Sequence, residues 1–195
     1  MKRFSILLLS FSMFIFLSAC TNQSTTSVSK ADTSSQEQDI LIAYFSWSGN
    51  TEKMANMIQE ETGGDLFKIE PVETYTDDYD TLLDQVQQEL NDNVRPDIAN
   101  VVNNWNDYKV IFVGYPTWWN HAPMVMLSFV ESYDWEGKTL IPFNTSGGSG
   151  FGNSLESIES SASGANILKG LSLDGDTVED SQNEVKTWIS ELGLQ

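Results

Sequence analysis

The chain has 195 residues, of which 28 are acidic and 10 are basic, giving a formal net charge of −18. This balance argues against nucleic acid as a partner, because binding a polyanion requires a basic surface. Solvated surface accounts for most of these charges, although they would also steer a basic protein partner or a cationic substrate.

Residues 1–20 have the features of a secretory signal. Lys2 and Arg3 precede an apolar run over residues 4–16, which is too short for a membrane-spanning helix. Residues 17–20, Leu-Ser-Ala-Cys, look like a bacterial lipobox, and Cys20 is the only cysteine, so the chain forms no intramolecular disulfide. We expect Cys20 to be lipidated and to anchor the protein to the outer face of the bacterial cell membrane. The alternatives are a cleaved signal with an incidental cysteine and an uncleaved anchor.

Residues 21–39 are rich in Ser, Thr, Gln and Asp and have almost no large apolar side chain. Such a segment cannot bury enough surface to fold, so we interpret it as a disordered tether. Residues 40–195 then form one domain of ordinary size. Loss of residues 1–20 removes two basic and no acidic residues, which makes the net charge two units more negative.

The domain opens with an apolar run over residues 40–45, typical of a central strand, and apolar residues at helical spacing follow from Met54 until Gly63 and Gly64. Between them, residues 46–51 supply three hydroxyls, an amide and a glycine where a helix would begin. Backbone N–H groups and the helix dipole favour an anion at this place, and the glycine permits a close approach. The loop therefore suits a phosphate. The alternative is an ordinary loop with a capped helix.

Residues 65–70 alternate polar and apolar side chains, which predicts a second strand that ends at Pro71. Strand, helix and strand form a βαβ unit with parallel strands. Residues 79–90 have apolar residues at helical spacing, which predicts a helix. For Tyr75 and Tyr79 we favour packing onto this helix over bordering a ligand site.

Residues 109–114 form another apolar strand, followed by a loop with two adjacent tryptophans between Pro116 and Pro123. Pro123 suits the first turn of a helix that carries apolar residues up to position 130. Adjacent tryptophans in a loop cannot both point into one core. At least one should be exposed, and exposed aromatic rings serve binding.

Residues 139–144 predict a third apolar strand, and residues 145–152 contain four glycines directly after it. So many glycines mark a tight turn or a backbone that approaches a ligand. Beyond this loop we expect a short helix at 156–160, a short strand at 167–168 and a final helix striped by apolar residues and ended by Gly193.

Alternating apolar strands and helices predict a doubly wound parallel sheet. Ligands bind such sheets beyond the carboxyl ends of the strands. The hydroxyl, tryptophan and glycine loops each follow a strand directly, so all three should lie at that edge. Together they describe a site for a flat heterocycle with a monophosphate, and FMN fits that description.

On these three motifs the domain from residue 40 onward resembles the flavodoxins, in particular bacterial flavodoxin-like lipoproteins. The resemblance implies a five-stranded sheet of order 2-1-3-4-5 with helices on both faces, and FMN bound without a covalent link. The phosphate would lie on the hydroxyl loop and the ring between the other two loops. The implied FMN-binding residues are Ser46, Trp47, Ser48, Gly49, Asn50, Thr51, Pro116, Thr117, Trp118, Trp119, Asn120, Thr145, Ser146, Gly147, Gly148 and Gly150.

The sequence departs from the family pattern at two places. Flavodoxins commonly place a glycine beside the flavin N5, where a peptide flip tunes reduction, and residues 118–121 contain none. Many flavodoxins also stack a tyrosine from the loop after the fourth strand, whereas this loop carries only Phe151. The stacking would therefore fall to Trp118 or Trp119.

Other site types fit less well. The glycines at 148, 150 and 152 follow a late strand, unlike those of a dinucleotide fingerprint, and a Gly-x-Ser-x-Gly hydrolase motif is missing. His121 is the only histidine, which argues against a zinc cluster. It either bonds to nearby backbone or donates a proton near reduced flavin or a substrate.

Three functions stay open at this point. The first is a tethered electron carrier that exchanges electrons with a redox protein or a small acceptor. The second is an FMN-dependent reductase that takes hydride from NAD(P)H and reduces a quinone-type acceptor. The third is a lipoprotein that binds a flavin or another phosphorylated ligand without redox turnover.

Overall fold

The computed structural model describes residues 39–194. The expected signal segment, Cys20 and the tether up to residue 38 lie outside this range and stay predictions. Within the described range, no helix is long and apolar enough to span a membrane.

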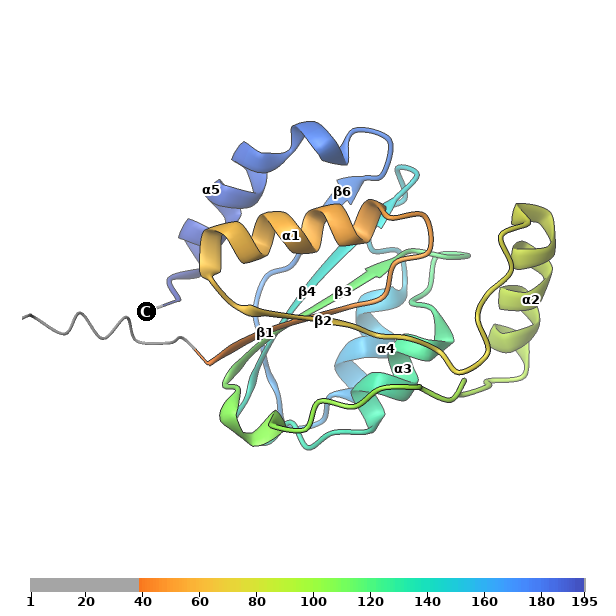
Figure 1. Cartoon of the computed structure of the whole chain (residues 1–195), viewed down its shortest axis with the longest axis horizontal. Coiled ribbons are helices and arrows are strands. Elements are labelled where there is room, and N and C mark those ends of the chain that lie inside the picture. Colours follow the sequence, from red (N-terminus) through yellow and green to blue (C-terminus); the bar gives the residue numbers. More distant parts are fainter. Residues whose placement is uncertain (1–38, 195) are drawn as a thin grey trace, which may run out of the picture. The chain divides into compact units, whose positions relative to one another are not determined.

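In residues 39–194, five helices and six parallel strands follow one another along the chain, with β5 and β6 in direct succession, and there are two single-turn 3-10 helices (Figure 1). The strands are β1 (Ile40–Tyr44), β2 (Asp65–Lys68), β3 (Val110–Pro116), β4 (Thr139–Ser146), β5 (Asn166–Ile167) and β6 (Leu171–Asp174). The helices are α1 (Asn50–Thr62), α2 (Tyr79–Asn91), α3 (Met124–Glu131), α4 (Ser154–Ser161), α5 (Gln182–Leu192), η1 (Trp105–Asp107) and η2 (Val178–Asp180).

The strands form one parallel sheet in the order β2-β1-β3-β4-β5, which confirms the predicted order and fold class. All five residues of β1 are buried, as expected for a strand between two neighbours and two helical layers. Two strands, β5 and β6, occupy the fifth place in the sheet. β5 pairs with the first residues of β4, and β6 pairs with Phe143–Ser146 of β4. The sequence predicted one short strand there, because a four-residue strand leaves little local pattern.

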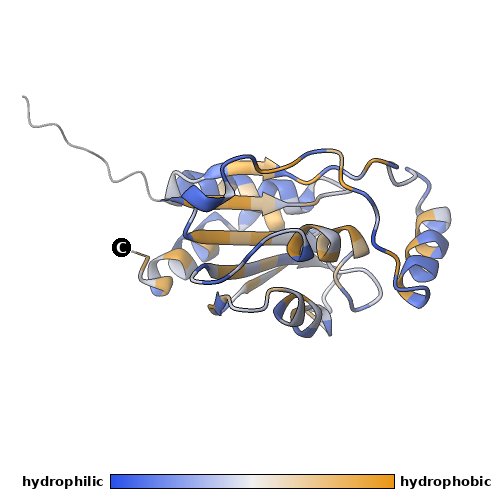
Figure 2. Ribbon diagram, turned by 90° about the horizontal axis from the view of Figure 1, so that it is seen from below, coloured by the Kyte–Doolittle hydropathy of each residue, from blue (hydrophilic) through white to orange (hydrophobic). Residues whose placement is uncertain are grey.

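Two hydrophobic clusters lie on opposite faces of the sheet. One contains α1 and α5 residues packed on the side chains of Ile40 and Ile42, and the other contains α3 and α4 residues packed on Leu41 and Ala43. The alternation follows from the two-residue period of a strand. Figure 2 shows the central strands as largely hydrophobic, in line with burial on both faces.

Helix α2 departs from this layering. Figures 1 and 2 both place it beyond the strand ends at which α1 begins, rather than over a face of the sheet. Asp78 caps its start, because its carboxylate accepts a hydrogen bond from the Thr81 N–H at 2.9 Å. Leu82 and Val86 are buried in the α3–α4 cluster. Residues 79–91 therefore stand at the carboxyl edge of the sheet.

Candidate functional site

The hydroxyl loop ends in a helix start with free backbone donors. Gly49, at φ 89°, is the N-cap of α1 and occupies the left-handed region that favours glycine. The Glu52 N–H donates to Ser46 Oγ at 3.2 Å, and the Lys53 N–H donates to Gly49 O at 3.0 Å. Within residues 39–194, the N–H groups of Asn50 and Thr51 have no such acceptor. With the positive end of the helix dipole, they fit an anion.

A buried hydrogen bond ties this loop to β4. The hydroxyls of Thr51 and Thr145 lie 2.9 Å apart, and both residues are almost fully buried. Ser48, by contrast, is exposed. The Thr51 side chain thus links the loop to the sheet, whereas the Ser48 hydroxyl faces solvent.

The tryptophan loop closes in a tight turn. Trp118 and His121 exchange two backbone hydrogen bonds, at 3.0 and 2.7 Å. The two residues between them, Trp119 at φ 48° and Asn120 at φ 65°, both lie in the left-handed region. This is the pattern of a type I′ turn, which usually contains glycine. The turn therefore holds local backbone strain, and it lies in the loop that was predicted to contact the ring of a ligand.

The two adjacent tryptophans point in different directions. Trp118 packs edge-on against Phe45 and Tyr75, with ring centroids 5.5 and 5.2 Å apart. Trp119 is 51% exposed, and its indole N–H donates to Leu83 O of α2 at 3.2 Å. The prediction that at least one of the pair is exposed is confirmed.

The glycine loop is bonded to the tryptophan loop. Thr117 Oγ1 donates to Gly150 O at 3.1 Å, and the Thr117 N–H donates to Thr145 O at 2.9 Å. Asn144 Nδ2 also donates to Gly150 O, at 2.8 Å, and to Thr117 Oγ1. Asn144 Oδ1 is buried and has no hydrogen-bond partner in the described chain. Sequence reasoning missed Asn144, although an amide at the end of an apolar strand is a signal that would have found it.

A second contact joins the same two loops. The Asn153 N–H donates to Asn120 O at 2.7 Å, and a methyl group on Gly152 would lie 2.7 Å from that same oxygen. The turn of the tryptophan loop therefore rests directly on the backbone of the glycine loop.

The segment that leads into α2 borders the hydroxyl loop. Trp47 Nε1 donates to Thr76 O at 2.9 Å, and the rings of Trp47 and Tyr79 lie 6.2 Å apart. Tyr75 is only 8% exposed and its hydroxyl donates to Glu89 at 2.9 Å; burial, then the nearby Glu89 charge, raises the pKa of Tyr75. Packing was predicted for both tyrosines and is confirmed for Tyr75. Tyr79 is 60% exposed beside Trp47, so for Tyr79 the prediction of packing is wrong.

The structure brings the three predicted loops together at one edge of the sheet. Gly147 and Gly148 are exposed, and Ser146 Oγ accepts a hydrogen bond from the Gly150 N–H at 3.0 Å. His121 is half-buried at the end of the tryptophan turn, where its backbone pairs with that of Trp118. Pro116 ends β3 beside Thr145 of β4.

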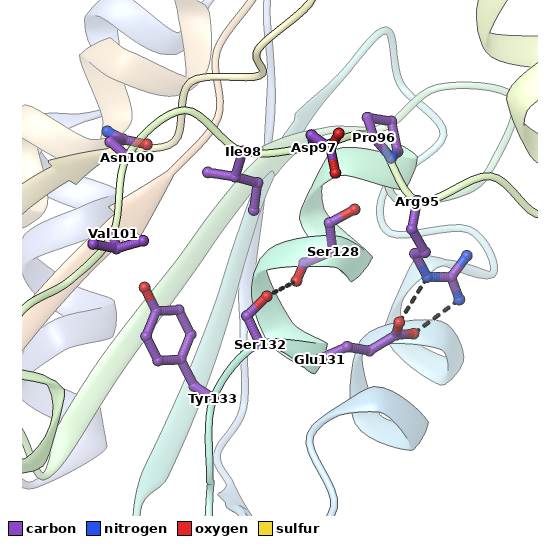
Figure 3. Close-up of a pocket in the computed structure, with 10 residues that line it drawn as sticks. All are labelled: Arg95, Pro96, Asp97, Ile98, Asn100, Val101, Ser128, Glu131, Ser132 and Tyr133. Atoms are coloured by element: carbon purple, nitrogen blue, oxygen red, sulfur yellow. Dashed lines mark hydrogen bonds and ion pairs between the residues drawn. The ribbon is translucent and has the colours of Figure 1, made fainter.

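A hollow of about 350 Å³ lies apart from these loops, between the segment after α2 and helix α3 (Figure 3). The guanidinium of Arg95 meets both carboxylate oxygens of Glu131 at 2.8 Å. These hydrogen bonds hold the pKa of Glu131 below its usual value. Because the Arg95 charge is paired here, the hollow offers no free cation for a ligand.

Comparison with known proteins agrees with this architecture. The flavodoxin family model matches residues 39–192. No curated protein matches the sequence. A protein of Bacteroides eggerthii that is classed as a flavoprotein is 33% identical with a TM-score of 0.71, over 80% of this chain and 98% of that one. A similarly classed protein of Bacteroides uniformis is 35% identical with a TM-score of 0.70, over 77% and 97%.

A third similar structure carries a ligand. It is a flavoprotein of Lactobacillus acidophilus in complex with FMN, 26% identical with a TM-score of 0.60, over 72% of this chain and 96% of that one. The family model covers most of the sequence, and the parallel sheet has the order that the resemblance implied. The chain belongs to the flavodoxin family.

Proposed function

We propose that the protein binds FMN without a covalent link and acts as an electron carrier. The observation that carries the proposal is the start of α1, where the unpaired N–H groups of Asn50 and Thr51 lie in the same loop as the exposed Ser48. These donors suit a phosphate without any basic side chain. The similar Lactobacillus acidophilus flavoprotein in complex with FMN supports the choice of ligand.

Each loop has a role in this proposal. The N–H groups of Asn50 and Thr51 and the hydroxyls of Ser46 and Ser48 would hold the phosphate. The tryptophan and glycine loops, joined through Thr117 and Asn144, would hold the ring. Bound FMN supplies the redox chemistry, while the protein orients the ring and limits its contact with water. The net negative charge of the chain would disfavour added negative charge on the ring and so lower its reduction potential.

We further propose that the carrier works at the outer face of the bacterial membrane. Lipidation at Cys20 would anchor it there, and a flexible tether of residues 21–39 would span about 25 Å. Its partner is then a redox protein or a small electron acceptor at that surface.

Titration of the purified protein with FMN, followed by anaerobic addition of NAD(P)H, tests this proposal. We expect a yellow protein that quenches flavin fluorescence on binding and is reduced only slowly by NAD(P)H alone. A colourless protein without FMN affinity would contradict the proposed binding of FMN and with it the role as an electron carrier. Rapid turnover with NAD(P)H and a quinone would identify a reductase instead, and bound flavin inert to every donor would identify a binding protein.

A further inference from the structure

A turn that none of the sequence motifs includes lies against the phosphate loop. It comprises residues 174–177 and begins at the last residue of β6, Asp174, which the strand register places beside Ser146 of β4. The Gly175 N–H donates to Ser146 O at 2.9 Å. A methyl group added to Gly175 would lie 2.9 Å from Asn50 Nδ2. The turn therefore touches the first residue of α1 from the side of β4.

The backbone does not explain the glycine at position 175. Its φ lies outside the left-handed region, so an alanine could adopt the same conformation. The space beside it holds the Asn50 amide, whose Nδ2 would lie 2.9 Å from a methyl group on Gly175. The nearest atom is the end of a flexible side chain. A methyl group at position 175 would therefore displace the Asn50 amide and leave the backbone in place.

The same turn carries two exposed carboxylates, those of Asp174 and Asp176. The Asp176 N–H donates to Asp174 Oδ1 at 2.9 Å, which fixes the direction of the Asp174 side chain. The single lysine of α1, Lys53, is paired with Glu179 of η2. This side of the phosphate loop is therefore negative, and the α1 lysine beside it is already paired.

We propose that the turn 174–177 limits the phosphate site to a monophosphate ester, with Gly175 as the residue that positions the Asn50 amide. This rests on the proposed function, in which the phosphate of a flavin lies at the start of α1. A flavin dinucleotide would carry its second phosphate and its adenosine outward past Asn50. There the carboxylates of Asp174 and Asp176 repel the additional negative charge, and specificity follows from this repulsion rather than from added contacts.

The first test is Gly175→Ala, with riboflavin as the matched ligand that lacks the phosphate. We expect the Kd for FMN to rise about tenfold, while the Kd for riboflavin changes by less than about twofold. The urea midpoint should stay close to that of the natural protein. An equal loss for both ligands, or an unchanged Kd for FMN, would overturn the positioning role.

The second test is the double variant Asp174→Asn and Asp176→Asn, which keeps the shape of the turn and removes both charges. We expect the ratio of the Kd for FAD to the Kd for FMN to fall about tenfold. The control is Glu184→Gln with Glu191→Gln on α5, which removes two exposed charges elsewhere and should leave the ratio unchanged.

The outcomes of these tests separate two failures. If the natural protein binds neither FMN nor riboflavin, both the proposed function and the limiting turn are wrong. If it binds FMN but the ratio is the same in the double variant and the control, the proposed function stands and only the role of the turn is overturned.

Discussion

At the scale of single residues, the candidate site depends on polar contacts between segments that are far apart in the sequence. Thr51 and Thr145 are separated by 94 positions, and their buried hydroxyls meet at 2.9 Å. A buried hydroxyl that loses its partner costs about 1–3 kcal/mol, whereas replacing both partners by apolar groups is nearly neutral. This pair is therefore a direct test of how the phosphate loop is fixed to the sheet.

The change Thr51→Val should lower the free energy of unfolding by about 1–3 kcal/mol, because it leaves the Thr145 hydroxyl buried without a partner. Adding Thr145→Val should restore part of this loss. Urea unfolding of the natural protein, both single variants and the double variant measures the coupling between the two side chains. Strictly additive effects would mean that the hydroxyls do not act as a pair.

The sequence predicted the residue types of the site better than their contacts. Ser48 and Trp119 are exposed at the edge where their motifs placed them, because a short loop after a buried strand has little freedom to point elsewhere. Asn144 and Gly175 were missed. Asn144 left a local signal, an amide at the end of an apolar strand, but its hydrogen bond to Thr117 joins segments far apart in the sequence. The same holds for Gly175, which lies beside Asn50, and no local pattern encodes such contacts.

At the scale of elements, helix α2 is held by side chains of the loops as well as by its buried apolar residues Leu82 and Val86. The indole groups of Trp47 and Trp119 donate to the backbone oxygens of Thr76 and Leu83. Residues that the sequence assigned to FMN binding thus also hold the helix at the mouth of the site. The helix itself was predicted from its apolar spacing, but its position was not, because periodicity gives a buried face and not the partner of that face.

The change Trp119→Phe keeps an aromatic ring but removes the N–H group that bonds to Leu83 O. We expect amide hydrogen exchange in α2 to become about fivefold faster, which corresponds to about 1 kcal/mol for one hydrogen bond. The matched control is Trp188→Phe, which removes a similar bond to Lys169 O and should leave α2 exchange unchanged. Unchanged α2 exchange in Trp119→Phe would show that this bond does not hold the helix.

At the scale of the whole molecule, the order of the strands followed from a few strong signals. Three continuous apolar runs, each followed by a loop with turn or glycine residues, are typical of parallel strands buried on both faces. The strands beside β4 were harder to predict from the sequence. β5 has two residues and β6 has four, and short edge strands carry weak periodicity. The 3-10 helix at Trp105–Asp107 was missed because three residues are too few to show a periodic pattern.

The expected anchoring of the whole chain can be tested through Cys20. In a bacterial host, Cys20→Ser should abolish incorporation of labelled fatty acid and release the protein from the membrane fraction, since one thiol carries the whole lipid attachment. Thr21→Ser is the control and should be labelled normally. Normal labelling of Cys20→Ser would rule out the lipobox.

The position of β1 has a mechanical consequence. The described chain enters the sheet at Ile40, on a strand with a parallel neighbour on each side, β2 and β3. A pulling force applied through residue 39 along this strand loads the hydrogen bonds to both neighbours in shear, so they must break together rather than one after another. A domain held by its amino end in this way would resist drag at a surface better than one held through an edge strand.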